Sequence, residues 1–213
     1  MKILDKKNKI YLLDEDNFDF PTLDMMKDDL VAVGGDFHPQ RLLNAYENGI
    51  FPWYIDEYNY IHWFSPQKRM VLKPEDFKVS KSLKKSILNK GFKIKSNGNF
   101  EEVIKSCANI KRKHEDSTWI SDEFIEAYTN LHHLDIAFSI ECYLNEELVG
   151  GLYGLLIGDI FCGESMFAKV TDASKVAFYH LCQQAKQNGI KIIDCQVYND
   201  HLASLGAFEI TRN

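Results

Sequence analysis

Alternating apolar and polar positions dominate the chain from Ile136 onward. This period of two predicts three consecutive antiparallel strands joined by tight turns, over 136–144, 148–157 and 160–167. An amphipathic helix is then predicted over 173–187, with Gly189 as its stop. A strand, a short helix and a last strand are predicted over 191–197, 200–205 and 207–211. This succession indicates an α+β protein with a mixed, mainly antiparallel sheet flanked by helices.

The chain before Ile136 carries a weaker pattern. We expect its first 60 residues to form loops and one short helix, over 40–48 and ended by Gly49. Pro52 biases the residue before it away from helix, so the aromatic segment 51–54 is expected to be an extended loop. Further along, a strand is predicted over 69–72 and helices over 80–89, 100–110 and 122–134. The whole order of elements fits an acyltransferase fold of the GNAT kind.

The chain has 213 residues, of which 45% are hydrophobic, so it can bury a core and is not wholly disordered. No apolar run reaches the roughly 18 residues that a membrane-spanning helix needs. The N-terminus lacks the apolar core of a secretory signal, so secretion is not expected. The cysteines are odd in number and none are spaced as C-x-x-C, which favours reduced thiols in a cytoplasmic protein over disulfides or a zinc site.

Basic residues are concentrated in one stretch of an otherwise acidic chain. The formal net charge is −6, yet residues 68–95 hold ten Lys or Arg against two acids. Lys105 and residues 111–113 extend this basic zone. Local charge of this kind attracts a phosphate backbone despite a negative total. A solvated, lysine-rich surface is the other interpretation.

Asp194 and Gln196 are the first candidates for chemistry. They come at the end of a predicted strand, and side chains two positions apart point to the same side. Asp194 could there accept a hydrogen bond from the side-chain amide of Gln196, which would orient the Gln196 carbonyl as an acceptor. A polar pair satisfied by the backbone is the alternative. Glu164 lies in an apolar strand, where an acid is either functional or at an edge facing water.

Three tryptophans, Trp53, Trp63 and Trp119, occur in loop-like sequence contexts. Aromatic rings beside a basic groove stack on nucleobases, at about 1–3 kcal/mol for each base. Packing in the core is the alternative for any one of them. The glycines within 34–35 and 150–154 have neither the G-x-G-x-x-G spacing nor the Gly-Lys-Ser/Thr sequence of a phosphate-binding loop.

Ten motifs follow one another along the chain: Val-Gly-Gly-Asp (33–36), Arg-Leu-Leu-Asn-Ala-Tyr (41–46), Gly-Ile-Phe-Pro-Trp (49–53), Ser-Pro (65–66), Thr-Trp-Ile (118–120), Leu-Val-Gly-Gly-Leu-Tyr-Gly (148–154), Phe-Cys-Gly-Glu-Ser-Met-Phe (161–167), Ala-Ser-Lys (173–175), Ile-Asp-Cys-Gln (193–196) and Ser-Leu-Gly-Ala (204–207). From about residue 20 onward, this series resembles bacterial leucyl/phenylalanyl-tRNA–protein transferases. Trp63-Phe64 departs from the two tryptophans common in the family, and Ala168 stands where serine is frequent.

The resemblance implies a small N-terminal domain, residues 1–66, and a GNAT-like catalytic domain, residues 67–213. It implies transfer of Leu or Phe, with Met a further option, from aminoacyl-tRNA to proteins whose N-terminal residue is Arg or Lys. Such a transfer marks the acceptor for degradation through the N-degron pathway. The expected partners are therefore Leu-tRNA, Phe-tRNA and acceptor proteins or peptides of that kind, with no cofactor, metal or membrane.

The resemblance also implies roles for individual residues. Trp53 and Trp119 are expected to hold the terminal adenosine of the tRNA. Asp194 and Gln196 are expected to form the catalytic pair, with Glu164 as a third catalytic residue. The aminoacyl pocket is expected to include Leu152, Phe161, Met166, Phe178 and Leu181. Contacts to the tRNA backbone are expected from the basic residues Lys81, Lys84, Lys85, Lys111, Arg112 and Lys113.

Two other classes of function remain open from the sequence. An acetyl-CoA-dependent GNAT enzyme would need a Q/R-x-x-G-x-G/A loop to hold a pyrophosphate, and none precedes the helix that begins at Ala173. A non-catalytic tRNA-binding protein would bind charged tRNA without consuming it. Incubation with radiolabelled Phe-tRNA and an Arg-initiated peptide separates these functions.

Overall fold

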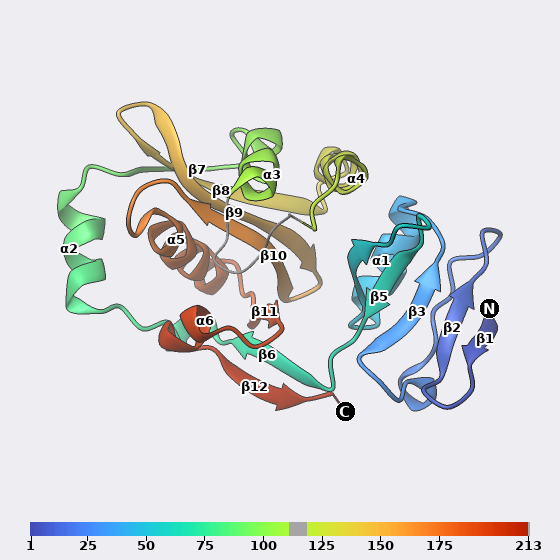
Figure 1. Ribbon diagram of the computed structural model, residues 1–213. Helices are drawn as coiled ribbons and strands as arrows, with labels where there is room; N and C mark the ends of the chain where they lie inside the picture. Colours follow the sequence, from blue (N-terminus) through green and yellow to red (C-terminus); the bar gives the residue numbers. More distant parts are fainter. Residues whose placement is uncertain (111–118, 213) are drawn as a thin grey trace.

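The computed structural model describes residues 1–110 and 119–212, which form two β-sheets with helices packed around them (Figure 1). The smaller sheet has the strand order β1-β2-β3-β5-β4. Its strands are β1 (Lys2–Asp5), β2 (Ile10–Leu13), β3 (Leu30–Gly34), β4 (Phe51–Ile55) and β5 (Ile61–Phe64). The short 3-10 helix η1 (Leu23–Met25) comes before β3, and helix α1 (Pro39–Glu47) comes after it.

The smaller sheet corrects the expectation of loops in this region. Each strand has only four or five residues, so none is long enough to make its alternation distinct. Pro52 lies within β4 rather than in a loop. It is tolerated because β4 is an edge strand of the sheet, where a missing N–H need not remove a ladder hydrogen bond. The one helix expected here, over 40–48, is confirmed as α1.

The larger sheet has seven strands in the order β12-β6-β11-β10-β9-β8-β7. They are β6 (Lys68–Leu72), β7 (Lys93–Ser96), β8 (Ala137–Leu144), β9 (Glu147–Ile157), β10 (Ile160–Ala168), β11 (Ile192–Gln196) and β12 (Phe208–Thr211). All neighbours are antiparallel except β10 and β11, which are parallel. The mixed, mainly antiparallel GNAT-like sheet expected from the sequence is confirmed, although the pattern did not predict β7.

Helices cover both faces of the larger sheet (Figure 1). Helices α3 (Phe100–Asn109) and α4 (Asp122–His133) pack on one face and α5 (Ala173–Gln187) on the other, while α2 (Lys81–Asn89) packs against α5. Two short helices are α6 (Asp200–Ser204) and the 3-10 helix η2 (Pro74–Asp76). Two hydrophobic clusters result, one with α3 and α4 and the other with α5. Tyr153 of β9 belongs to the first cluster and Leu152 to the second, because successive residues of a strand point to opposite faces.

The first cluster also joins the two sheets, since it contains Tyr11 and Trp63 of the smaller sheet as well as Phe167 of the larger one. Trp63 is fully buried, and its indole N–H donates to the carbonyl oxygen of Gly34 at 2.8 Å. Core packing is therefore the right interpretation for this tryptophan. A division into domains 1–66 and 67–213 would fall between β5 and β6, and it remains a prediction.

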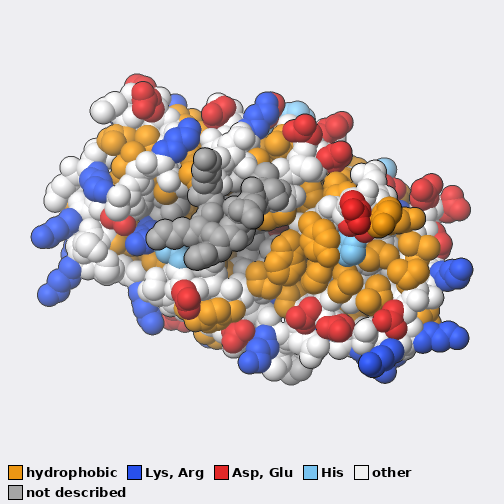
Figure 2. Space-filling view, viewed as in Figure 1, with side chains coloured by type: hydrophobic (Ala, Val, Ile, Leu, Met, Phe, Trp, Pro, Cys, Tyr) orange, Lys and Arg blue, Asp and Glu red, His pale blue; other side chains and the backbone are white. Residues whose placement is uncertain are grey.

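The fold divides the basic stretch. Lys81, Lys84 and Lys85 are exposed on α2, and Figure 2 shows Lys and Arg side chains projecting from this edge of the molecule. Arg69 of β6, in contrast, is largely buried and paired with an acid. Of the ten bases counted in the sequence, Arg69 is thus withdrawn from a nucleic acid, whereas the nine lysines are exposed, three of them on α2.

Strands β10 and β11 diverge after three paired residues. Their ladder ends with Cys162 opposite Asp194, whereas β10 stays paired with β9 to its last residue. Each strand has a bulge just beyond that point, at Glu164 of β10 and at Cys195 of β11. A bulge adds an unpaired residue and re-aims the neighbouring side chains. The sheet is therefore open where Glu164 and Gln196 lie.

Candidate active site

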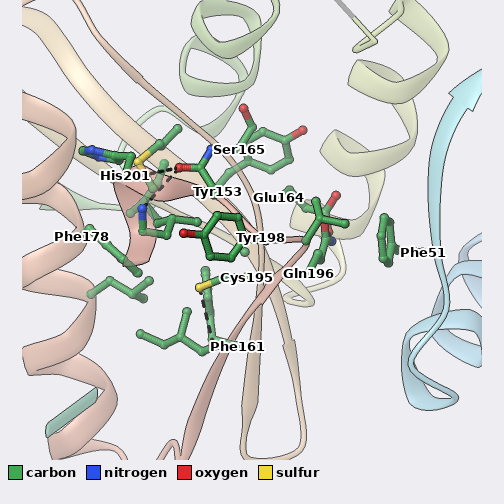
Figure 3. Close-up of a pocket in the computed structure, with 18 of the residues that line it drawn as sticks. Phe51, Tyr153, Phe161, Glu164, Ser165, Phe178, Cys195, Gln196, Tyr198 and His201 are labelled. Atoms are coloured by element: carbon green, nitrogen blue, oxygen red, sulfur yellow. Dashed lines mark hydrogen bonds between the residues drawn. The ribbon is translucent and has the colours of Figure 1, made fainter. Parts of the chain in front are cut away.

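A cavity of about 340 Å³ lies where β10 and β11 diverge (Figure 3). Towards the smaller sheet and α4 it is bordered by Phe51, Trp53 and Trp119. Glu164 and Gln196 lie between that side and Phe178 of α5. The α5 side is lined by apolar residues packed in the second hydrophobic cluster, which are Leu152, Phe161, Met166, Phe178 and Leu181. The cavity thus runs from an aromatic side to an aliphatic and aromatic pocket, with polar groups between them.

Glu164 accepts hydrogen bonds from three side chains. The hydroxyl of Tyr46 and the Nε2 of Gln196 donate to its Oε1, each at 2.7 Å, and the hydroxyl of Tyr128 donates to its Oε2 at 3.3 Å. The two tyrosine hydroxyls also lie within hydrogen-bond distance of each other, and since each carries one proton, that bond replaces one of the two to Glu164 when the acid is ionised. Desolvation by burial raises the pKa of Glu164 to about 7, against the opposing effect of these donors. An edge position facing water is therefore the wrong interpretation of this acid.

Gln196 presents one end of its amide to the cavity. Because its Nε2 donates to Glu164, its carbonyl oxygen is the end left for a ligand. Gln196 adopts a φ of 64°, in the left-handed region that few side-chain-bearing residues occupy. Such strain is typical of functional positions, where the surrounding structure holds an unfavourable backbone in place. The arrangement provides a fixed hydrogen-bond acceptor within the cavity.

Asp194 does not line the cavity but lies behind Gln196. Its Oδ1 accepts from the backbone N–H of Gln196 at 2.9 Å, and its carboxylate accepts from Arg69. The expected hydrogen bond from the Gln196 side chain to Asp194 is therefore wrong, because that side chain donates to Glu164 instead. The bulge at Cys195 explains the difference, since an extra residue breaks the alternation that would place both side chains on one side.

The two tryptophans that line the cavity are half-buried and held by ring contacts. Trp53 packs edge-on against Phe64 with ring centroids 4.8 Å apart, and Trp119 packs edge-on against Phe124 at 5.4 Å. They come from distant segments, one from β4 and one from the residues that precede α4. Two indoles fixed in this way can stack on a planar base that enters the same side of the cavity.

Comparison with known proteins decides the family. Residues 71–213 match the model of a family described as leucyl/phenylalanyl-tRNA protein transferase, and residues 35–67 match the model of its N-terminal domain. The chain belongs to this transferase family. The leucyl/phenylalanyl-tRNA–protein transferase of Flavobacterium johnsoniae is 49% identical over 203 residues, which cover 95% of each chain. That of Dechloromonas aromatica is 51% identical over 197 residues, 91% of this chain and 84% of the relative.

Among solved structures, the fold of this transferase family member is similar to that of FemX. The two share 12% sequence identity with a TM-score of 0.51, over 80% of this chain and 66% of FemX. At that identity the likeness concerns the fold alone. It agrees with the GNAT-like sheet described above and says nothing of substrate.

Most of the residues predicted from the sequence to form the site of this transferase surround one cavity. Trp53, Trp119, Glu164, Gln196 and the five residues of the expected aminoacyl pocket all line it. Asp194 lies one layer behind. Of the expected backbone contacts, Lys111, Arg112 and Lys113 lie outside the described residues. Among residues 1–110 and 119–212, no group of three or more His, Cys, Asp or Glu side chains is placed to hold a metal ion.

Three residues of the site had no role in the sequence-based prediction. Tyr46 and Tyr128 hold Glu164, and Arg69 holds Asp194. Tyr46 ends one of the ten motifs, and Arg69 counts in the sequence only as one of ten clustered bases. The motif that ends in Tyr46 was a signal that this residue matters, but nothing in the sequence indicates that Tyr46 contacts Glu164.

Proposed function

We propose that this protein transfers Leu or Phe from aminoacyl-tRNA to the α-amine of proteins that begin with Arg or Lys. The observation that carries the proposal is one cavity that holds, in order, two tryptophans, an oriented carboxamide and an apolar pocket. The indoles suit the terminal adenosine, and the pocket suits an apolar aminoacyl side chain. The ester that joins these two parts would lie beside Gln196. Membership of the family supports the same assignment.

The proposed reaction is the aminolysis of an ester. The acceptor nitrogen attacks the aminoacyl carbonyl carbon, the bond from that carbon to the ribose oxygen breaks, and the proton lost by the nitrogen ends on the ribose hydroxyl. An α-amine has a pKa of about 7.7–8.0, so on the order of a tenth is neutral at pH 7 and no strong base is needed. The Gln196 carbonyl oxygen accepts a hydrogen bond from the attacking amine and keeps it in line.

Direct transfer is favoured over a cysteine-bound intermediate. Cys195 lines the cavity, and Cys162 is the last residue of β10 paired with β11. Burial raises the pKa of both thiols, so both stay protonated near neutral pH. The thiolate, rather than the thiol, is the nucleophile. Neither cysteine is therefore suited to take up the aminoacyl group.

Selection of the acceptor needs attraction for the side chain of an N-terminal Arg or Lys. Glu164 is the acid that lines the cavity, but its two oxygens already accept from side chains of the protein. We therefore assign Glu164 to the orientation of Gln196. The net charge of −6 would draw cationic peptides toward the protein from a distance.

The proposed donor, a charged tRNA, places the reaction in the cytoplasm. Reduced thiols, which the odd number of cysteines favours, fit that compartment. No helix of the described residues has both the length and the apolar character to cross a membrane. The partners of the reaction are then a charged tRNA and an acceptor protein with a basic first residue.

Transfer of label tests the proposed function directly. The protein is incubated with radiolabelled Phe-tRNA and a peptide that begins with Arg. Label should appear in that peptide and not in the same peptide with an acetylated N-terminus, because acetylation removes the nucleophile. Phe-tRNA that is bound but never consumed would instead identify a tRNA-binding protein without transferase activity.

Leu152→Phe should change donor selectivity. Leu152 lines the pocket from β9 and is 3% exposed, so a larger ring there takes space from the donor side chain. A pocket of this kind discriminates by about 1–3 kcal/mol per methylene, and transfer of Phe should fall about tenfold more than transfer of Leu. Competition between labelled Phe-tRNA and Leu-tRNA measures the ratio. An unchanged ratio would place the aminoacyl pocket elsewhere.

Replacing Lys81, Lys84 and Lys85 of α2 together with Gln should weaken the salt dependence of tRNA binding. Each phosphate contact contributes about −0.7 to −0.9 to the slope of log K against log salt concentration. If all three lysines contact phosphate, the slope should become less steep by about 2 to 3. Titration of Phe-tRNA at several salt concentrations gives the slope. The same slope in the variant and the wild type would exclude α2 from the interface.

The acetyl-CoA alternative is disfavoured at the N-terminus of α5. A pyrophosphate would need free space and positive potential there. Instead Asp172 occupies the N-cap position, and its carboxylate accepts from Ser86 at 2.7 Å. The helix start also lies close to β9, since a Cβ added at Gly150 would come within 2.5 Å of the Ala173 Cβ. Tight binding of acetyl-CoA is therefore not expected.

A further inference from the structure

Arg69 links three parts of the fold through one buried guanidinium. Its Nε lies 2.9 and 3.0 Å from the two carboxylate oxygens of Asp194, and its Nη2 donates to Oδ2 at 2.6 Å. Its Nη1 donates to the carbonyl oxygen of Gly49 at 2.8 Å. Both side chains are close to 10% exposed. A planar guanidinium can make all of these bonds at once, which an ammonium cannot.

The hydrogen bond from Arg69 to Gly49 reaches the β4 wall, which is the side of the cavity formed by Phe51 and Trp53. The adenosine is proposed to stack on this wall. Gly49 lies in the turn between α1 and β4, and Phe51 and Trp53 of β4 both line the cavity. The guanidinium carbon of Arg69 also lies 5.0 Å from the ring centroid of Phe51. Arg69 itself belongs to β6, the strand paired with β11. The position of the β4 wall is therefore tied to the strand that carries Gln196.

Asp194 is not among the residues that line the cavity, and both of its carboxylate oxygens are taken up by hydrogen bonds. Among the described residues, its side chain accepts hydrogen bonds from the Arg69 guanidinium and the backbone N–H of Gln196. The contact with Arg69 positions the β4 wall, and the contact with the Gln196 backbone positions the strand end that carries the carboxamide. A buried ion pair of this kind is sensitive to loss of either partner, because the remaining charge is left without compensation.

We propose that Arg69 and Asp194 form a clamp that sets the distance between the adenosine wall of β4 and Gln196, and that both are positioning residues. This inference rests on the proposed function. It explains how the donor, held on the β4 wall, and the acceptor amine, held by Gln196, are kept at the right distance from each other. Asp194 then contributes to transfer through the clamp. Neither of its oxygens takes part in moving a proton.

Kinetics of two single variants and their combination test the clamp. Arg69→Lys keeps the charge but cannot reach Asp194 and Gly49 together, so the KM for Phe-tRNA should rise about tenfold. The KM for an Arg-initiated peptide should stay within about twofold. Asp194→Asn should lower kcat/KM by a similar factor, through the KM for Phe-tRNA rather than through kcat. The double variant Arg69→Lys with Asp194→Asn breaks the same clamp as either single change, so its loss should be close to the larger single loss rather than the product of the two.

The surface pair of Lys191 and Asp159 provides a matched control. Its atoms are 2.6 Å apart, but the two side chains are 76% and 47% exposed. Lys191→Gln with Asp159→Asn should leave both KM values unchanged. Losses that multiply in the double variant, or an Asp194→Asn loss confined to kcat with the KM for Phe-tRNA unchanged, would overturn the clamp and give Asp194 a direct catalytic role. Wild-type protein that transfers no Phe would overturn the proposed function itself, and the clamp with it.

Discussion

Gln196→Met should lower kcat about 100-fold and leave donor binding within about threefold. Methionine keeps the length of the side chain, and the backbone at this position keeps its φ of 64°. However, methionine offers no carbonyl oxygen to the attacking amine. A misplacement of about 1 Å at a reacting group costs on the order of 100-fold in rate, which sets the expected size. Single-turnover transfer from Phe-tRNA to an Arg-initiated peptide measures the loss.

Gln187→Met is the matched control for this substitution. Gln187 is the last residue of α5 and is exposed, far along the helix from the cavity-lining Phe178. The same chemical change there should leave kcat unaltered. If Gln196→Met retains full activity while the control behaves as expected, the carboxamide does not hold the amine, and the ribose hydroxyl becomes the main candidate for that role.

The larger sheet was predictable because its strands are long and regular. Strands β8, β9 and β10 have eight to eleven residues, and α5 has fifteen, so their periods repeat often enough to be distinct. The strands of the smaller sheet have four or five residues, and Pro52 weakens the signal of β4 further. Their stability comes from packing against Phe124, Phe167 and other residues far away in the sequence, which no local pattern contains.

The position of the site was predictable, but its internal contacts were not. The strand end paired Asp194 with Gln196, and the family resemblance added Glu164 to them. The side chains that hold them are distant in sequence: Tyr46 is 118 residues from Glu164, and Arg69 is 125 residues from Asp194. A pairing across such separations is a property of the fold. The period-two argument also assumes a regular strand, which the bulge in β11 removes.

Glu164→Gln should lower kcat at pH 8 about 100-fold and abolish part of the pH dependence near neutrality. Desolvation raises the pKa of Glu164 to about 7. The ionised carboxylate accepts the Gln196 amide N–H and leaves the amide carbonyl for substrate. A protonated Glu164 has an O–H of its own to donate, so the amide turns its carbonyl toward it. Wild-type kcat should therefore fall as the pH drops through about 7, and the profile of the variant should retain only the ionisation of the acceptor amine.

Glu164→Gln should stabilise the folded protein at pH 8, although it lowers kcat there. Because the folded state raises the pKa of Glu164 from 4.5 to about 7, the native protein binds this proton more tightly than the unfolded chain between those values. Ionisation of Glu164 thus lowers stability as the pH rises through this window. The melting temperature of Glu164→Gln should exceed that of the wild type at pH 8, and the difference should shrink toward pH 5. Glu147→Gln, at the exposed start of β9, should change neither quantity. A variant less stable than the wild type at pH 8 would instead make the carboxylate a structural anion, required to hold the hydroxyls of Tyr46 and Tyr128.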